Sequence, residues 1–347
     1  MKRMLLAVFL LVWVSVPTLM AETSFFEICA GGTPVDVQQA LQQGSLVTER
    51  NADGSTPLIF AAYSNADPKV LDVLIEAGAS AHETDSNLTT PLMHAAFNNP
   101  NPAIITTLLA YGADPDAVDN HGNTAVLYAA GHNPNPEVIG TLLDAGAVLE
   151  DFGTDTHTAL LWLAASYNQN PQTISYLIDR GADITQTDSN GTTALMMASG
   201  QNSNPLVTQV LVETGLDVNA RDRDQRTALM FAAGYSTNWE VLSTLYTLGA
   251  ALDLQDTQGM SALMHAAGLN PEPLIAGWLI FMGANGALRS NEGGTAYDYS
   301  AWNEAVNNDE YASWYLYELA GGKTYDQIDG DFYYEVQFLD FFSGGDI

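Results

Sequence analysis

The residues of this chain that could carry out acid, base or nucleophilic chemistry are scattered rather than grouped. No two of its six histidines lie three or four residues apart, the spacing at which neighbouring side chains of one helix share a metal ion. The single cysteine, Cys29, permits no internal disulfide, and we expect it to be a small core residue. There is no Gly-rich phosphate loop and no nucleophile elbow, and the stretch DQIDGDFYYE (326–335) lacks the alternate carboxylate spacing of a calcium loop. The sequence therefore predicts no enzymatic activity, no cofactor and no metal site.

Charge limits the partners that such a chain can bind. Among 347 residues there are 41 Asp and Glu but only 10 Lys and Arg, which gives a formal net charge of −31. A surface of this kind repels the phosphates of nucleic acids and the headgroups of anionic membranes, so we expect neither as a partner. A basic protein, a cation, or solubility alone remain as explanations of the charge.

The N-terminus has the pattern of an export signal. Met1, Lys2 and Arg3 form a short basic segment, residues 5–16 are apolar, and Ala21 supplies a small residue for cleavage. The apolar run is shorter than the ~20 residues that usually span a membrane. We therefore expect residues 1–21 to be a signal peptide and the mature chain, beginning near Glu22, to be periplasmic or secreted.

The elements that would position any functional residue are repeated along the chain. A threonine or serine recurs every 34 residues, with one step of 35, at Thr56, Thr90, Thr124, Thr158, Thr193, Thr227, Ser261 and Thr295. A period of this size is typical of stacked supersecondary units. The sequence thus predicts a solenoid.

Each repeat contains the signals of two helices. In TTPLMHAAFNNPNPAIITTLLAYGA (89–113), a Thr-Pro pair supplies an N-cap and a proline at the first helical position. The alanine pair that follows leaves room for a second helix, which opens with an Asn-Pro pair and carries a buried Ile/Leu stripe. The glycine near the end favours the left-handed conformation that terminates a helix. Each unit is therefore expected to be a pair of antiparallel helices followed by a polar turn.

At residues 24–320 the sequence resembles the ankyrin-repeat family. The resemblance rests on the Thr-Pro-Leu or Thr-Ala-Leu helix start, the paired alanines, the Leu-Leu pair and the Gly-Ala-Asp end, as in residues 112–114. Aspartates in the hairpins also match, namely Asp85, Asp119, Asp188, Asp222 and Asp256. The resemblance implies an all-α ankyrin-repeat solenoid of paired antiparallel helices linked by hairpin loops. It departs from the family in an Asn-rich link between the two helices, as in GHNPNP.

The repeats also suggest the domain organisation. We expect a capping half-repeat at 22–46, ankyrin repeats at 47–320 with the last one atypical, and an acidic aromatic tail at 321–347. One unit, DFGTDTHTALLWLAASYNQNP (151–171), carries the extra residue, either in its first helix or in the link. A local bulge there would disturb the curvature of the stack.

One position of the first helix stands out as a candidate binding position. Four residues after the opening Thr or Ser, the side chain is directed away from the alanine pair, toward the groove that first helices line in this family. These residues, here called the +4 ladder, are large, and none is Asp, Glu, Lys or Arg: Phe60, His94, Tyr128, Trp162, Met197, Phe231, His265 and Tyr299. They either stiffen the stack by packing on one another or form an aromatic binding surface, and both can hold at once.

The function expected from the sequence is non-catalytic binding of a protein. The chain is interpreted as an exported monomer that binds a partner, possibly basic, through the concave groove and the hairpin tips. Two alternatives remain: an inhibitor or immunity-type protein that blocks a basic toxin or enzyme, and a purely structural scaffold. Burial of the +4 ladder would favour the scaffold.

Overall fold

The computed structural model describes residues 24–147 and 156–323, and this part of the chain forms nine helix pairs and one further helix. The first helices of the pairs are α1 (Phe25–Gly31), α3 (Pro57–Ser64), α5 (Pro91–Asn98), α7 (Ala125–His132), α9 (Thr156–Tyr167), α11 (Ala194–Gln201), α13 (Ala228–Tyr235), α15 (Ala262–Leu269) and α17 (Ala296–Ser300). The second helices are α2 (Pro34–Gln42), α4 (Pro68–Glu76), α6 (Pro102–Ala110), α8 (Glu137–Asp144), α10 (Pro171–Asp179), α12 (Pro205–Glu213), α14 (Trp239–Thr247), α16 (Pro273–Phe281) and α18 (Glu304–Asn308). The last helix is α19 (Glu310–Ala320). The described residues thus form the all-α solenoid that the repeats predict.

The helices begin and end where the capping residues stand. In α5 the hydroxyl of Thr90 accepts a hydrogen bond from the Met93 N–H at 3.2 Å. In α6 the Asn101 side chain accepts one from the Ala103 N–H at 3.0 Å. Gly112, after α6, has φ +84°, which an L side chain rarely adopts. The N-termini of α5 and α6 are therefore capped by their own preceding residues.

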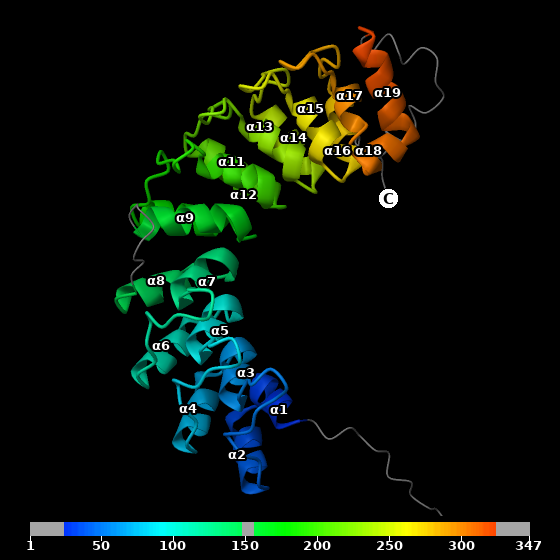
Figure 1. Cartoon of the computed structure of the whole chain (residues 1–347). Helices are drawn as coiled ribbons and strands as arrows, with labels where there is room; N and C mark the ends of the chain where they lie inside the picture. Colours follow the sequence, from blue (N-terminus) through cyan, green and yellow to red (C-terminus); the bar gives the residue numbers. More distant parts are fainter. Residues whose placement is uncertain (1–23, 148–155, 324–347) are drawn as a thin grey trace, which may run out of the picture.

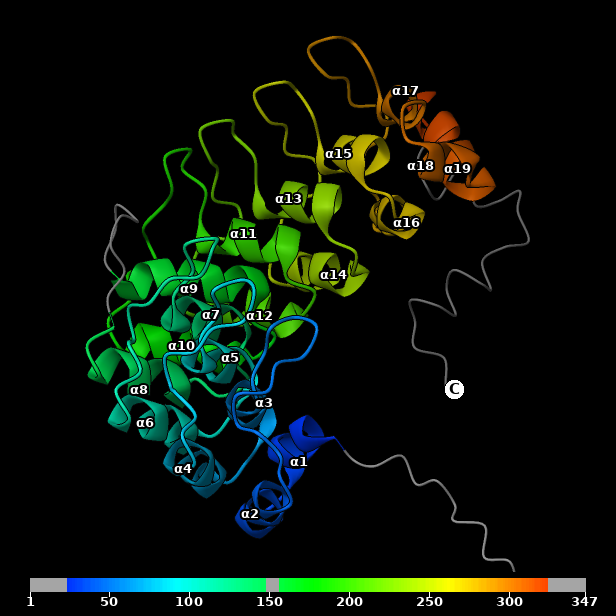
Figure 2. The same ribbon diagram turned by 60° about the horizontal axis from the view of Figure 1, so that its bottom comes forward.

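The units stack side by side in a curved row, and loops project from one edge of it (Figures 1 and 2). Each first helix packs against the first helix of the next unit. Small residues permit this approach: Ala95 and Ala96 of α5, like the alanine pairs of its neighbours, are fully buried. The second helices fill the other layer with leucine, isoleucine and valine, as Ile104, Ile105 and Leu108 do in α6.

A ladder of buried asparagines joins the units through their links. Asn133 is fully buried, and its Nδ2 donates to the carbonyls of Ala96 and Asn99 in the preceding unit at 2.8 and 3.0 Å. Its Oδ1 accepts from the Asn135 N–H at 2.9 Å. We call the residues at this position the asparagine ladder: Asn65, Asn99, Asn133, Asn168, Asn202 and Asn270. The half-buried Asn303, the N-cap of α18, continues it by donating to the Asn270 carbonyl. The asparagine amides of the link thus donate to backbone carbonyls that would otherwise be unpaired. They also fix the spacing between neighbouring units.

The extra residue of the irregular unit lies inside its first helix. α9 has 12 residues, against eight in α7 and α11, and Thr158 lies within it instead of opening it. Counted back from the asparagine ladder at Asn168, the buried alanine pair is now Ala164 and Ala165. The lengthened helix therefore absorbs the insertion, and the link keeps its hydrogen bonds.

The second-helix layer is bridged differently beside this insertion. The Tyr176 hydroxyl of α10 comes so close to Gly140 of α8 that a Cβ at residue 140 would overlap it. Arg180 stacks on the Tyr176 ring, with its guanidinium carbon 5.2 Å from the ring centroid, and binds Asp144 of α8 at 3.1 Å. Long side chains of α10 thus reach across to α8 at the point where the sequence predicts a disturbed curvature.

Both ends of the described stack carry altered units. In α1, Cys29 is fully buried as expected, and burial raises the pKa of its thiol to about 12. At the other end α19 packs on α16, α17 and α18 and closes the last unit. The expected signal peptide (1–21) and most of the expected tail (321–347) lie outside the described residues.

Candidate functional site: the first-helix face

The +4 ladder lies along one face of the row of first helices, which we call the first-helix face. All eight of its members are partly exposed. The register changes in the irregular unit, because the extra residue of α9 moves Leu163, not Trp162, to the place directly before the alanine pair. A Cβ added at Gly131 would lie 3.6 Å from the Leu163 side chain, just as one added at Gly200 would lie 3.6 Å from that of Phe231. Counting from Thr158 is therefore wrong by one residue in this unit, and Trp162 lies one position before the ladder.

The ladder is tied to the hairpins by an aspartate that the sequence places five residues before the helix start. In the hairpin before α5, Asp85 Oδ1 accepts backbone N–H groups of Asn87 and Thr89 at 2.8 and 3.0 Å, which shapes the turn. The other oxygen, Oδ2, lies 3.0 Å from Nε2 of His94. One carboxylate thus fixes both the hairpin and the ladder residue of its unit.

The same pairing recurs with different donors in other units. The Tyr128 hydroxyl donates to Asp119 at 2.5 Å, and His265 Nε2 lies 2.9 Å from Asp256. Where the ladder residue is Phe231, Arg226 binds Asp222 through Nε at 2.8 Å and lays its guanidinium over the ring at 4.8 Å. In the last unit the Tyr299 hydroxyl donates to Ser290 at 2.8 Å. Five of the ladder side chains are therefore held in place by residues of the hairpins.

Burial and hydrogen bonding set the protonation of this face. Burial opposes ionisation of Asp85, but hydrogen bonds from the Thr89 N–H and from His94 outweigh it, so its pKa lies below its ordinary value. Burial, together with the hydrogen bond to Asp119, raises the pKa of Tyr128 to about 12. Burial lowers the pKa of His265 despite its contact with Asp256. At neutral pH Asp85 is thus ionised and Tyr128 is neutral.

A second row of aromatic side chains, missed by the sequence analysis, runs beside the ladder. It lies near the C-terminal ends of the first helices and consists of Tyr63, Phe97, His132, Tyr167 and Tyr235. The rings of Phe97 and His132 are 4.6 Å apart between centroids, and those of His132 and Tyr167 are 6.4 Å apart. A recurring aromatic residue just after the alanine pair, as in AAYS and AAFN, was the signal that could have revealed it.

The polar side chains of this face join the hairpins to the ladder. The described residues bring no three His, Cys, Asp or Glu side chains into an arrangement that could bind a metal ion. The cavity beside the His94–Asp85 pair is lined by neither serine nor cysteine, and its aliphatic hydroxyl belongs to Thr89. Within the described ranges, no helix combines the length and the apolar character needed to cross a bilayer.

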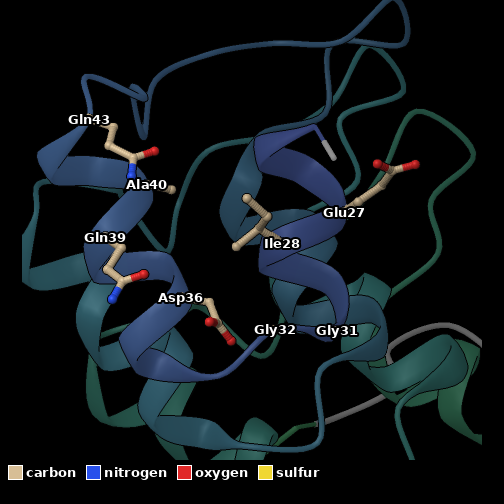
Figure 3. Close-up of a pocket in the computed structure, with 8 residues that line it drawn as sticks. All are labelled: Glu27, Ile28, Gly31, Gly32, Asp36, Gln39, Ala40 and Gln43. Carbon is tan, nitrogen blue, oxygen red and sulfur yellow. The ribbon is translucent and has the colours of Figure 1, made fainter. Parts of the chain in front are cut away.

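A second hollow lies in the N-terminal capping unit. It has a volume of about 420 Å³ and lies between α1 and α2, with Ile28 on one side and Gln39 and Gln43 on the other (Figure 3). Its two carboxylates are used as caps, because Glu27 accepts the Ser24 N–H at 2.9 Å and Asp36 accepts the Thr33 N–H at 2.8 Å. The hollow lies in the first described unit of the stack, and both of its carboxylates are already used in helix caps.

The fold and this face define a helical-repeat protein whose recognition surface is distributed over many units. The family model of ankyrin repeats in three copies matches residues 25–119, 58–152, 92–188 and 161–256. The chain belongs to the ankyrin-repeat family. Ankyrin repeats generally mediate protein–protein interactions and are typically non-catalytic, which suggests protein partners.

Other comparisons add little beyond the fold. No match was found among curated proteins. Among solved structures, the chain is similar to the human ASB11 ankyrin repeat domain, with 22% identity and a TM-score of 0.49 over 65% of this chain and 98% of that one.

Proposed function

We propose that this chain is an exported, non-catalytic protein-interaction module that binds a basic protein partner on its first-helix face and hairpin tips. The observation that carries the proposal is the partial exposure of the +4 ladder, in which Leu163 takes the place of Trp162. A scaffold that used these residues only for packing would bury them. Here they stay accessible while hairpin carboxylates hold several of them in fixed orientations, and such preorganisation lowers the entropy that binding costs.

Charge supports a basic partner. Asp85, Asp119 and Asp256 place carboxylates directly behind ladder residues, and the chain as a whole has a formal net charge of −31. Complementary charge accelerates encounter and disfavours acidic competitors. Because these carboxylates lie within hydrogen-bonding distance of ladder residues, their charge acts at the same surface as the aromatic side chains.

The proposal is tested by alanine substitutions on both faces of the stack. Tyr128→Ala and Phe231→Ala should each weaken binding of a partner, captured by cross-linking from the exported fraction, by about tenfold or more, since aromatic groups at an interface centre are frequent hot spots. Tyr246→Ala is the matched control, because Tyr246 is 36% exposed on the second helix α14. Thermal unfolding of every variant separates lost affinity from lost stability. Unchanged affinity in both ladder variants, or an equal loss in the control, would place binding elsewhere.

Export is a separate part of the proposal. It is supported by the basic start and apolar run of residues 1–16 in the sequence. When the full chain is expressed in bacteria, the mature protein should be recovered outside the cytosol with an N-terminus near Glu22. Recovery of the intact chain, including Met1, from the cytosol alone would contradict the proposed export. It would not affect the proposed interaction surface.

A further inference from the structure

A small cavity opens on the first-helix face at the junction of α3, α5 and α7. Its volume is about 250 Å³, and its walls include Tyr63 of α3, His94 and Phe97 of α5, Tyr128 of α7 and Asp85 of the intervening hairpin. Pockets for drug-sized ligands usually start at about 300 Å³. The cavity therefore suits a single side chain better than a whole small molecule.

Aromatic rings from three successive units surround this space. Tyr63 and Phe97 are nearly parallel, with an interplanar angle of 19° and centroids 6.4 Å apart. Tyr128 meets Phe97 edge-on at 71°, with centroids 5.9 Å apart. Tyr63 also meets His94 edge-on, at 72° and 6.2 Å. Ring faces and edges thus enclose the cavity from several directions, and the face of an aromatic ring attracts a cation.

The electrostatics of the cavity favour positive charge. The Asp85 side chain is only 8% exposed, yet its backbone hydrogen bonds keep it ionised. The negative charges of Asp119 and Asp85 both contribute to the raised pKa of Tyr128, although burial is the larger cause. No lysine or arginine lines the cavity. A cation would therefore gain both a carboxylate and aromatic faces without displacing an existing positive group.

The chain itself provides a comparison unit that lacks aromatic side chains at two of the corresponding positions. The pair formed by His265 and Asp256 repeats the geometry of His94 and Asp85. There, however, the positions of Tyr63 and Phe97 are occupied by Gly234 and Gly268. His265 is also more covered than His94, with 13% of its side chain exposed against 24%. The His–Asp pair thus serves the hairpin in both units, whereas Tyr63 and Phe97 are additions specific to the first.

We propose that this cavity binds the ammonium or guanidinium group of a lysine or arginine side chain of the partner protein. The inference rests on the proposed function, because a protein supplies the cation, and it specifies which group the partner inserts and where. The acidic composition of the chain and the size of the cavity both match this occupant.

The inference can be tested with short peptides and the mature chain. We would titrate acetylated, amidated Gly-Gly-Lys-Gly-Gly, and its arginine, norleucine and glutamate counterparts, into protein labelled with ¹³C at methionine methyl groups. Met93 lines the cavity, and Met264 holds the equivalent place in the comparison unit, so their signals report the two sites separately. The lysine and arginine peptides should shift Met93 and not Met264. Equal binding of the norleucine peptide, or no shift of Met93 by the lysine peptide, would overturn the proposal.

Substitutions at Phe97 separate cation recognition from apolar contact. Phe97→Leu keeps an apolar side chain but removes the ring face, and should weaken lysine-peptide binding about fivefold or more, whereas Phe97→Tyr should preserve it. If Phe97→Leu disturbs folding, Tyr63→Leu provides a second test, because Tyr63 is 38% exposed. Tyr235→Leu, on the same row in a distant unit, is the control and should have no effect. A folded Phe97→Leu or Tyr63→Leu variant with unchanged lysine binding would contradict the inference.

A failure of the cation site can be distinguished from a failure of the proposed function. A captured protein partner whose affinity depends on Phe231 but not on Phe97 would support the interaction module and contradict the cation site. Lysine-peptide binding at Met93, in a chain that captures no protein, would support the site and contradict the proposed function. Tetramethylammonium chloride, added as a free cation, should compete with the lysine peptide, and an absence of competition would count against an aromatic cation site.

Discussion

At the scale of single residues, backbone conformation explains much of the repeat. In seven of the units the residue two before the opening Thr or Ser has a positive φ, and it is glycine in five of these, as in Gly122 at φ +81°, and Gln225 in one. Leu88 occupies the same place with φ +63° although it has a branched side chain. A leucine in this left-handed region is strained by contact between its Cβ and the backbone.

We therefore predict that Leu88→Gly stabilises the protein by about 1 kcal/mol, because relief of the strain exceeds the entropy that glycine loses on folding. Urea unfolding would measure this change in the free energy of unfolding. Gly122→Leu is the reciprocal control and should destabilise the fold, since a Cβ at residue 122 would meet no atom within 4 Å and only the backbone strain remains. A neutral Leu88→Gly together with a neutral Gly122→Leu would show that the hairpin relaxes at no cost.

Residue types predicted the capping prolines, the terminal glycines and the burial of Cys29, because each depends on local conformation or on simple hydrophobicity. They did not predict the pairing of Asp85 with His94. That contact joins positions nine residues apart through the hairpin, so it depends on the path of the loop and not on a helical period. The aromatic row escaped notice for a similar reason, since its members stand at slightly different positions from unit to unit.

At the scale of elements, the links between helices also hold neighbouring units together through hydrogen bonds. The asparagine ladder satisfies carbonyls between neighbouring units, and Ser236 interrupts it. The sequence showed the recurring asparagines but not their partners, which belong to the preceding unit. It also could not place the extra residue of the irregular unit, because an insertion in the helix or in the link leaves the same spacing in the sequence.

The ladder leads to a prediction at this scale. Ser236→Asn should stabilise the protein by about 1 kcal/mol, because the new amide can donate to the carbonyls of the preceding link while its oxygen keeps the Asn238 N–H. Asn133→Ala should destabilise it by about 2 kcal/mol or more, since it leaves the Ala96 and Asn99 carbonyls without this donor. Thermal unfolding of both variants measures these effects. If Ser236→Asn proves destabilising while Asn133→Ala is harmless, the ladder does not couple the units.

At the scale of the whole molecule, the free energy of unfolding should be about the sum of the intrinsic stabilities of the units and of the interfaces between neighbouring units. Most contacts between elements link helices of the same unit or of adjacent units. The two ends differ from the interior, since α1 and α2 pack on α3 and α4, in which Leu58, Val70 and Leu71 are fully buried. An interior unit has similar neighbours on both sides and can be removed without exposing a new kind of surface.

We accordingly predict that deletion of residues 227–260, one 34-residue period that contains Ser236, leaves a folded and shorter solenoid. The deletion joins Arg226 to Ser261 and lets Asn270 follow Asn202, so that the asparagine ladder becomes continuous. Deletion of residues 22–46 removes only 25 residues but should be more harmful, because it exposes the apolar side chains of α3 and α4 to water. Circular dichroism and size-exclusion chromatography of the two variants measure the difference. An unfolded interior deletion beside a fully folded, monomeric cap deletion would refute nearest-neighbour stability in this chain.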